Sequence, residues 1–280
     1  FPNVQEIEIL FKENNFFSIL DFSHQLNSKF KDTTLPNFFD CSVYSSSSIK
    51  TLDTLGGGHV TTNNKFLYQD LIIYQSELKS PNRLFLIKKS FINLFRNLAT
   101  SRFFFNVFTF FIIRFFSLIK PGMMIKQTGK RPKNPMTSLP KTWFQKYSSV
   151  QALIGLKKLN SISKIDDKRI HNVLIFKKYC PHAKLLPVLE YSHPVYWQLV
   201  IKIESPINFQ RYCLNSGIDI ATSSLLLISS LSNFSGSINV VNAKDQYLKS
   251  CIIPCNHFIS SNDMMNIAKI VNLYDDQVNY

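Results

Sequence analysis

The sequence predicts an α/β protein. Its 280 residues are 45% hydrophobic, which is sufficient for one large domain or two of ordinary size. Two short apolar runs, residues 17–21 and Cys41–Ser45, are typical of strands, and each ends on a polar side chain, Asp21 and Ser45. Helix-like and strand-like segments alternate around them, a pattern typical of α/β folds. Polar residues at the ends of neighbouring strands indicate a ligand site at one edge of a sheet.

The first eighty residues justify this prediction element by element. Val4–Asn14 has the apolar spacing of a helix and leads into the strand 17–21. The strand Cys41–Ser45 leads into a serine run, 45–48, and then Lys50. A third short strand, 59–62, is closed by a turn at Asn63-Asn64.

The middle of the chain is basic and rich in phenylalanine. No Asp or Glu lies between Glu77 and Asp166, whereas that interval holds 17 Lys and Arg. Within it, residues 83–98 and 103–119 have helical spacing, and Pro121-Gly122 ends the second helix. The longest uncharged run there, 103–113, has 11 residues, whereas a spanning helix needs about 20.

The middle segment therefore predicts two helices that lie in the interface of an anionic membrane. Three alternatives stay open: an arm packed against a second subunit, a true membrane span, and an artefact of the sequence being a fragment. Nucleic-acid binding is disfavoured, because phenylalanines at helical spacing form an apolar face and not a stacking platform.

The C-terminal part predicts a mixed α+β domain. Helices are expected over 143–159 and 166–179, a strand over 195–203, and a helix over 209–216 that Gly217 ends. Residues 218–221 are expected to be extended. Cys251, Cys255 and His257 have the residue types of a zinc corner, but no second ligand pair exists and the segment reads as a buried strand. We expect thiols in a reducing cytoplasm.

Lys50 is the strongest candidate for chemistry. It lies between the serine run and the glycines 56–58, downstream of the strand that ends in Asp21. A Schiff-base site needs an amine to hold an aldehyde cofactor, an anion to keep a pyridine nitrogen protonated, and hydroxyls for a phosphate. Lys50, Asp21 and Ser45 have these chemical groups.

These motifs resemble the DegT/DnrJ/StrS family of pyridoxal-phosphate aminotransferases that act on nucleotide-linked keto sugars. The matching stretches are Asp21-Phe22-Ser23-His24, Ser45, the segment 56–64, the helical residues 150–156 with Leu159, the closing strand 252–257 and the last helix 260–271. The resemblance implies the PLP-dependent transferase fold (fold type I). It implies that residues 1–80 are the C-terminal part of the large domain, 81–135 a helical insertion, and 136–280 the small domain. The chain would then be a C-terminal fragment, inactive by itself.

The resemblance also implies the roles of four residues toward pyridoxal 5'-phosphate. Lys50 would bond the cofactor covalently and move a proton, and Asp21 would pair with the pyridine nitrogen. His24 would hydrogen-bond the phenolic oxygen, and Ser45 would donate to the phosphate. Two departures stand out: residues 144–146 replace an Asn-x-Arg pair, and Gly57 replaces a common acidic residue.

The expected function is transfer of an amino group from an amino-acid donor to a nucleotide-linked keto sugar, in the synthesis of surface polysaccharide or glycoconjugates. The resemblance implies a homodimer, and we expect a cytoplasmic protein. The basic, phenylalanine-rich residues 81–135, which the resemblance does not cover, predict peripheral attachment at the inner face of the membrane and no nucleic-acid partner. The alternative is a catalytically relaxed paralogue that binds a membrane or a partner.

Overall fold

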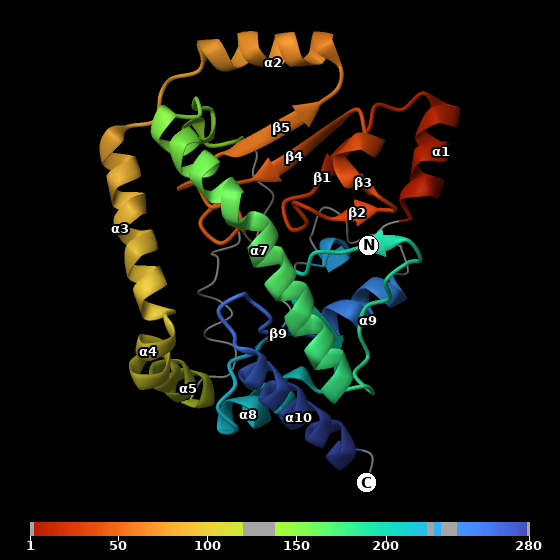
Figure 1. Ribbon diagram of the computed structural model, residues 1–280, viewed down its shortest axis with the longest axis vertical. Coiled ribbons are helices and arrows are strands. Elements are labelled where there is room, and N and C mark those ends of the chain that lie inside the picture. The colour runs from red at the N-terminus through yellow and green to blue at the C-terminus, as the bar shows by residue number, and fades with distance from the viewer. Residues whose placement is uncertain (1–2, 120–137, 223–226, 231–239, 279–280) are drawn as a thin grey trace. The chain divides into compact units, whose positions relative to one another are not determined.

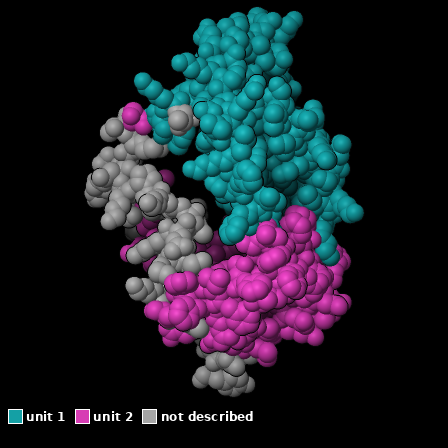
Figure 2. Space-filling model, turned by 90° about the vertical axis from the view of Figure 1, so that its left-hand side faces the viewer, with its two compact units in different colours: residues 1–97, 139–170, 187–197 teal, residues 98–138, 171–186, 198–280 magenta. Residues whose placement is uncertain are grey.

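The computed structural model describes residues 3–119, 138–222, 227–230 and 240–278. The chain divides into two compact units (Figure 2), of which the first comprises residues 1–97, 139–170 and 187–197 and the second residues 98–138, 171–186 and 198–280. The predicted segments 1–80, 81–135 and 136–280 stay a prediction. Residues 139–170 belong to the first unit because they pack on its loop 46–58.

The first unit is built on a sheet of three strands in the order β1-β4-β5 (Figure 1). β1 (Ile19–Asp21) runs parallel to β4 (Cys41–Ser45), and β4 pairs antiparallel with β5 (Gly58–Thr62). All three strands were predicted. β1 begins later than predicted, because the amide and hydroxyl of Ser18 both donate to Asp40 Oδ2 at 2.7 Å.

A second, smaller sheet completes the first unit in the order β3-β2-β6. Its strands, none of which was predicted, are β2 (Lys29–Phe30), β3 (Thr33–Thr34) and β6 (Ser192–His193). Short antiparallel pairs of two residues leave no detectable alternation in a sequence. The chain around them forms a small core of Val4, Phe30 and Leu35.

Two helices begin at asparagine caps. The predicted helix α1 (Val4–Asn14) begins after Asn3, whose side chain accepts the amide of Glu6, and ends at Asn15 in the left-handed conformation. Asn64, predicted to form a turn, also caps α2 (Lys65–Glu77), a helix that was not predicted. Its side chain accepts two backbone amides, those of Phe66 and Leu67.

The prediction of two helices over 143–159 and 166–179 is wrong. A single helix, α7, runs from Ser149 to Tyr179, and residues 141–143 form a separate 3-10 turn, η3. Ser148 and Gln151 form a capping box, in which each side chain bonds the other residue's backbone amide, so the helix begins at Ser149. The connecting residues 160–165 contain no Gly or Pro and bury Ile162 in the core, so the helix continues through them.

The second unit has a sheet in the order β7-β9-β8. The strand predicted over 195–203 is shorter in the structure, where β7 covers Leu199–Lys202. The helix predicted over 209–216 begins earlier, at Pro206, because proline is favoured in the first turn of a helix. Gly217 follows that helix with a φ of 85°, which suits glycine. The remaining elements are η4 (Ile228–Ser230), β7 (Leu199–Lys202), β8 (Ala221–Thr222), β9 (Ser250–Ile253), α8 (Pro206–Asn215), α9 (Val241–Lys249) and α10 (Ser261–Val278).

The middle of the chain is helical, as predicted. α3 (Arg83–Ala99) is followed by α4 (Arg102–Phe104), a π-helical turn η2 (Phe105–Thr109) and α5 (Phe110–Ile119). The predicted stop at Pro121-Gly122 lies outside the described residues. Among the described helices, none is by itself long and apolar enough to cross a membrane, although by length and composition the consecutive pair 83–99 and 102–117 could do so together.

All five cysteine side chains are buried as thiols. Burial raises the pKa of Cys213 and that of Cys251 to about 12, so both thiols are protonated at neutral pH. In the described part of the chain, no three His, Cys, Asp or Glu side chains are grouped as metal ligands, and this includes Cys251, Cys255 and His257.

Candidate active site

Asp21 and Ser45 lie on the same face of the first unit's sheet. Asp21 pairs with Val43 in the parallel register, and Ser45 is two residues further along β4, so alternation places all three side chains on one side. Ser23 joins the two strand ends: its amide donates to Asp21 Oδ1 at 3.0 Å, and its hydroxyl accepts the amide of Ser45 at 3.0 Å. This role of Ser23 was not predicted.

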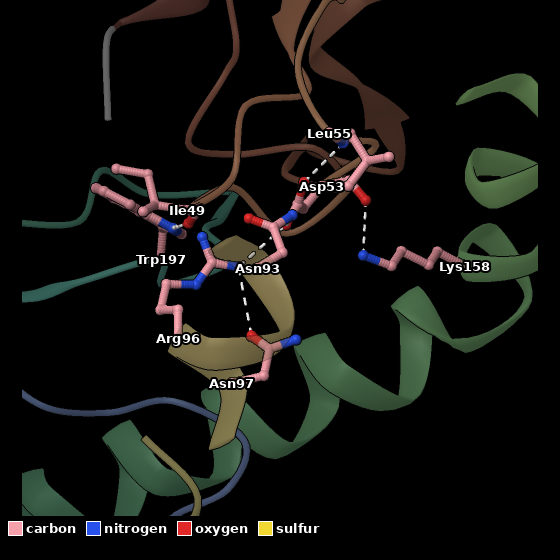
Figure 3. A network of polar contacts seen from close by, with 8 residues as sticks. All are labelled: Ile49, Asp53, Leu55, Asn93, Arg96, Asn97, Lys158 and Trp197. Carbon is pink, nitrogen blue, oxygen red and sulfur yellow. Dashed lines mark hydrogen bonds and ion pairs between the residues drawn. The ribbon is translucent and has the colours of Figure 1, made fainter. Parts of the chain in front are cut away.

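Lys50 and His24 meet at the ring of Trp197. The Lys50 ammonium lies 4.7 Å from the centre of the indole, and the His24 imidazole stacks on it with ring centres 4.2 Å apart and planes 2° from parallel. The indole Nε1 donates to the Ile49 carbonyl at 3.0 Å (Figure 3), which ties the tryptophan to the turn that holds Lys50. Sequence reasoning assigned Trp197 to a strand, because nothing local relates it to residues about 150 positions earlier.

The charges of this group are coupled. Burial raises the pKa of Asp21, but hydrogen bonds from Ser23, the charge of His24 when its ring is protonated and the charge of Lys50 together lower it by more, so the carboxylate is ionised at neutral pH. Burial lowers the pKa of Lys50, and the negative charge of Asp21 opposes this. Burial and the charge of Lys50 lower the pKa of His24, again against Asp21, so the imidazole is neutral at pH 7.

The loop from Ser46 to Gly58 closes on its own first residue. The carbonyl of Ser46 accepts the amides of Thr54 and Gly56 at 3.1 and 3.2 Å. Leu55, Gly56 and Gly57 have positive φ values of 69°, 116° and 84°. A Cβ at Gly57 would lie 3.0 Å from the Tyr147 ring, so both the backbone and the space at this position require glycine where the family often has an acidic residue.

Asp53 anchors the loop to α3 (Figure 3). Asp53 is buried, and its Oδ2 accepts a hydrogen bond from Asn93 at 2.9 Å and forms an ion pair with Arg96 at 3.1 Å. Its Oδ1 accepts the amide of Leu55 at 2.9 Å, which stabilises the left-handed conformation of that residue. One carboxylate thus fixes the loop conformation and its attachment to the helix.

Helix α7 holds the same loop from another side. Three of its side chains bond the loop: Gln151 donates to the Gly56 carbonyl (3.1 Å), Lys158 to the Asp53 carbonyl (2.6 Å) and Arg169 to the Thr51 hydroxyl (2.6 Å). The Tyr147 hydroxyl, just before the helix, donates to Thr54 at 2.5 Å. These bonds restrict the loop, and therefore the main chain of Lys50, to one conformation.

We expect Trp197 fluorescence to report the titration of His24, because a protonated imidazole quenches an indole on which it stacks. In a Trp143→Phe protein, Trp197 is the single tryptophan, and its emission should fall as the pH drops through the pKa of His24. Lys50→Met removes a positive charge that lowers the pKa of His24, whereas the negative charge of Asp21, which raises that pKa, remains. The midpoint of the transition should therefore move to higher pH. Lys65→Met, on the exposed α2, is the matched control. A transition that persists in His24→Gln, or a midpoint that Lys50→Met leaves in place, would contradict the observed geometry.

Comparison with solved structures shows the fold. An aminotransferase from Brucella abortus named for the DegT, DnrJ, EryC1 and StrS proteins superposes with a TM-score of 0.68 at 12% identity, covering 98% of this chain and 61% of that one. PseC from Helicobacter pylori, an aminotransferase involved in pseudoaminic acid biosynthesis, gives 0.68 at 17% identity, with 99% and 64% covered. The chain has the fold of these aminotransferases.

A third solved structure, DesI with its TDP-sugar product, gives a TM-score of 0.58 at 13% identity and covers 97% of this chain and 59% of that one. The chain therefore spans about three fifths of the length of the structures it resembles. The predicted fold type I is confirmed. No protein-family model and no curated protein matches the sequence.

The residues present fit pyridoxal phosphate. The cofactor needs an amine with a lowered pKa, a carboxylate that stays ionised, and hydrogen-bonding groups for its phenolic oxygen and phosphate. Lys50 and Asp21 have these properties, and neutral His24 can donate or accept a hydrogen bond beside them. Ser45 lies on the same face of the sheet as Asp21. The assignment of these four residues to the cofactor stays a prediction.

Proposed function

We propose that this chain holds the catalytic lysine of a PLP-dependent aminotransferase that acts on a nucleotide-linked keto sugar. The observation that supports it best is the grouping of Lys50 and His24 at the ring of Trp197, where the charge of Lys50 is coupled to that of Asp21 at the end of β1. A surface lysine in a turn would need neither a buried anchor for its loop nor an aromatic contact for its ammonium group.

Each residue has a definite task in this proposal. Bound pyridoxal phosphate would supply an electron sink for proton loss at the carbon that bears the amino group. Lys50 would hold the cofactor and, when its amine is free, take up and return that proton at Nζ, which burial favours by lowering its pKa. Asp21, ionised, would keep the pyridine nitrogen protonated, His24 would orient the ring through its phenolic oxygen, and Ser45 would bind the phosphate.

The sugar substrate is proposed from the solved structures with this fold. One is described as studied in the presence of its TDP-sugar product and another as involved in pseudoaminic acid biosynthesis. A role in surface polysaccharide or glycoconjugate synthesis, and assembly as a homodimer in the cytoplasm, belong to the same proposal and rest on the resemblance of the motifs.

The test is transfer of labelled nitrogen. The complete protein would be incubated with pyridoxal phosphate, a panel of ¹⁵N-labelled amino acids and nucleotide-linked keto sugars, and the sugar products analysed by mass spectrometry. We expect label in the sugar, and we expect Asp21→Asn to lower its rate of appearance by about 10²-fold or more, because a neutral amide no longer stabilises the protonated ring. Ser18→Ala, at the other end of β1, is the control. Cofactor binding without transfer to any sugar would favour the relaxed paralogue instead.

A further inference from the structure

Helix α3 has two unlike sides: its mainly polar side faces the protein and its apolar side faces solvent, which is the reverse of a helix that packs on a protein core. The side that contacts the rest of the first unit holds one buried apolar residue, Leu86, and is otherwise polar: Asn93 is buried, and Asn93 and Arg96 both bond the Asp53 carboxylate. The opposite side, by the 100° step of a helix, holds Leu84, Ile87, Phe91, Leu94 and Phe95, which are 50–73% exposed. A helix that placed its apolar stripe on the core would have the reverse distribution.

Two exposed basic residues flank this apolar stripe. By the helical period, Arg83 lies along one border and Lys88 along the other, and both side chains face solvent. Long basic side chains beside an apolar face can reach lipid headgroups while the apolar side chains enter the acyl boundary. No acidic residue occurs between Glu77 and Asp166, so the sequence around the stripe adds no repulsion toward an anionic surface.

We propose that the outer face of α3 docks on an anionic membrane, with the apolar stripe in the headgroup region and Arg83 and Lys88 on acidic lipid. The charge pattern selects this occupant over a second protein subunit, because a buried subunit contact would desolvate both cations without a partner of opposite charge on this helix. The polar inner side explains how the helix stays attached to the protein while its apolar side is free. The surface would hold the protein at the cytoplasmic leaflet, where anionic lipids are concentrated.

The test is flotation of the complete protein with vesicles of phosphatidylcholine, either pure or mixed with phosphatidylserine. We expect much stronger partition onto the anionic vesicles than onto the pure phosphatidylcholine vesicles. Arg83→Glu with Lys88→Glu should lower the partition coefficient by at least about fivefold for each charge. Phe91→Ser with Phe95→Ser should lower it by about tenfold for each phenylalanine, because each loses the free energy of burying a large apolar side chain.

A matched control exists on α2, where Lys65 and Phe66 are exposed, the latter by 78%. Lys65→Glu with Phe66→Ser should leave partition unchanged, and tryptophan fluorescence should show every variant to be folded. Raised salt should release the protein only in part, since apolar contacts are not screened. Equal partition onto both kinds of vesicle, partition onto neither, complete release by salt or an equal loss in the control would overturn the proposal. So would a dimer, seen by sedimentation without vesicles, that the α3 variants dissociate.

Discussion

Replacing Lys50 by alanine should abolish covalent attachment of pyridoxal phosphate. The complete protein with the cofactor should show a visible absorption band, and borohydride reduction should fix the cofactor at Lys50, as seen by peptide mass spectrometry. The physical reason is that Lys50 has a pKa lowered by burial, so it holds more neutral, nucleophilic amine than an exposed lysine. Its loop is fixed at several points, so the amine is presented in one place.

The specificity of the attachment is the decisive part of this test. Lys65→Ala, in an exposed lysine of the same unit, should retain the band and the labelled peptide. Lys50→Arg should lose both, although it keeps the positive charge, because a guanidinium stays protonated and is not nucleophilic. Trapping on any other lysine in the unmodified protein would show that the assignment of Lys50 is wrong.

Replacing Asp53 by alanine should destabilise the first unit by about 3 kcal/mol, since the change leaves Arg96 without its ion pair and removes the acceptor of two hydrogen bonds. Asn93, which is buried, loses the partner of its amide group. Leu55 loses the bond that stabilises its positive φ. Urea unfolding followed by Trp197 fluorescence in a Trp143→Phe protein would measure the loss within this unit.

One further variant separates charge from hydrogen bonding at Asp53, and a second is a surface control. Asp53→Asn retains an acceptor for Leu55 but not the ion pair, so it should lose less stability than Asp53→Ala. Asp70→Ala, on the exposed surface of α2, should change stability by less than about 0.5 kcal/mol. If Asp53→Ala unfolded at the same urea concentration as Asp70→Ala, the carboxylate would not be the anchor described above.

Several elements could be predicted because their signals are local. Val4–Asn14 has helical periodicity between two asparagine caps, and Cys41–Ser45 is a short apolar run that ends at a turn. The order of Asp21, Ser45 and Lys50 likewise follows from strand ends and glycines near them in the sequence. Element boundaries were less predictable, and the break expected inside α7 does not exist. Burial of Ile162 in the core stabilises the helix by more free energy than the low helix propensity of the polar residues around it costs.

The sequence by itself determined the α/β class and the positions of the strands around the candidate site, and it predicted Lys50 as the candidate lysine, because these depend on neighbours within a few residues. Only the tertiary structure decided what surrounds that lysine. Trp197 reaches Lys50 and His24, and α3 and α7 reach Asp53, across about 40 to 170 residues of chain, and no local pattern encodes such contacts. The same holds for α3, whose periodicity shows an apolar stripe but not which side faces the protein. The buried Asp53 carboxylate decides that, because the polar side chains of α3 must meet it.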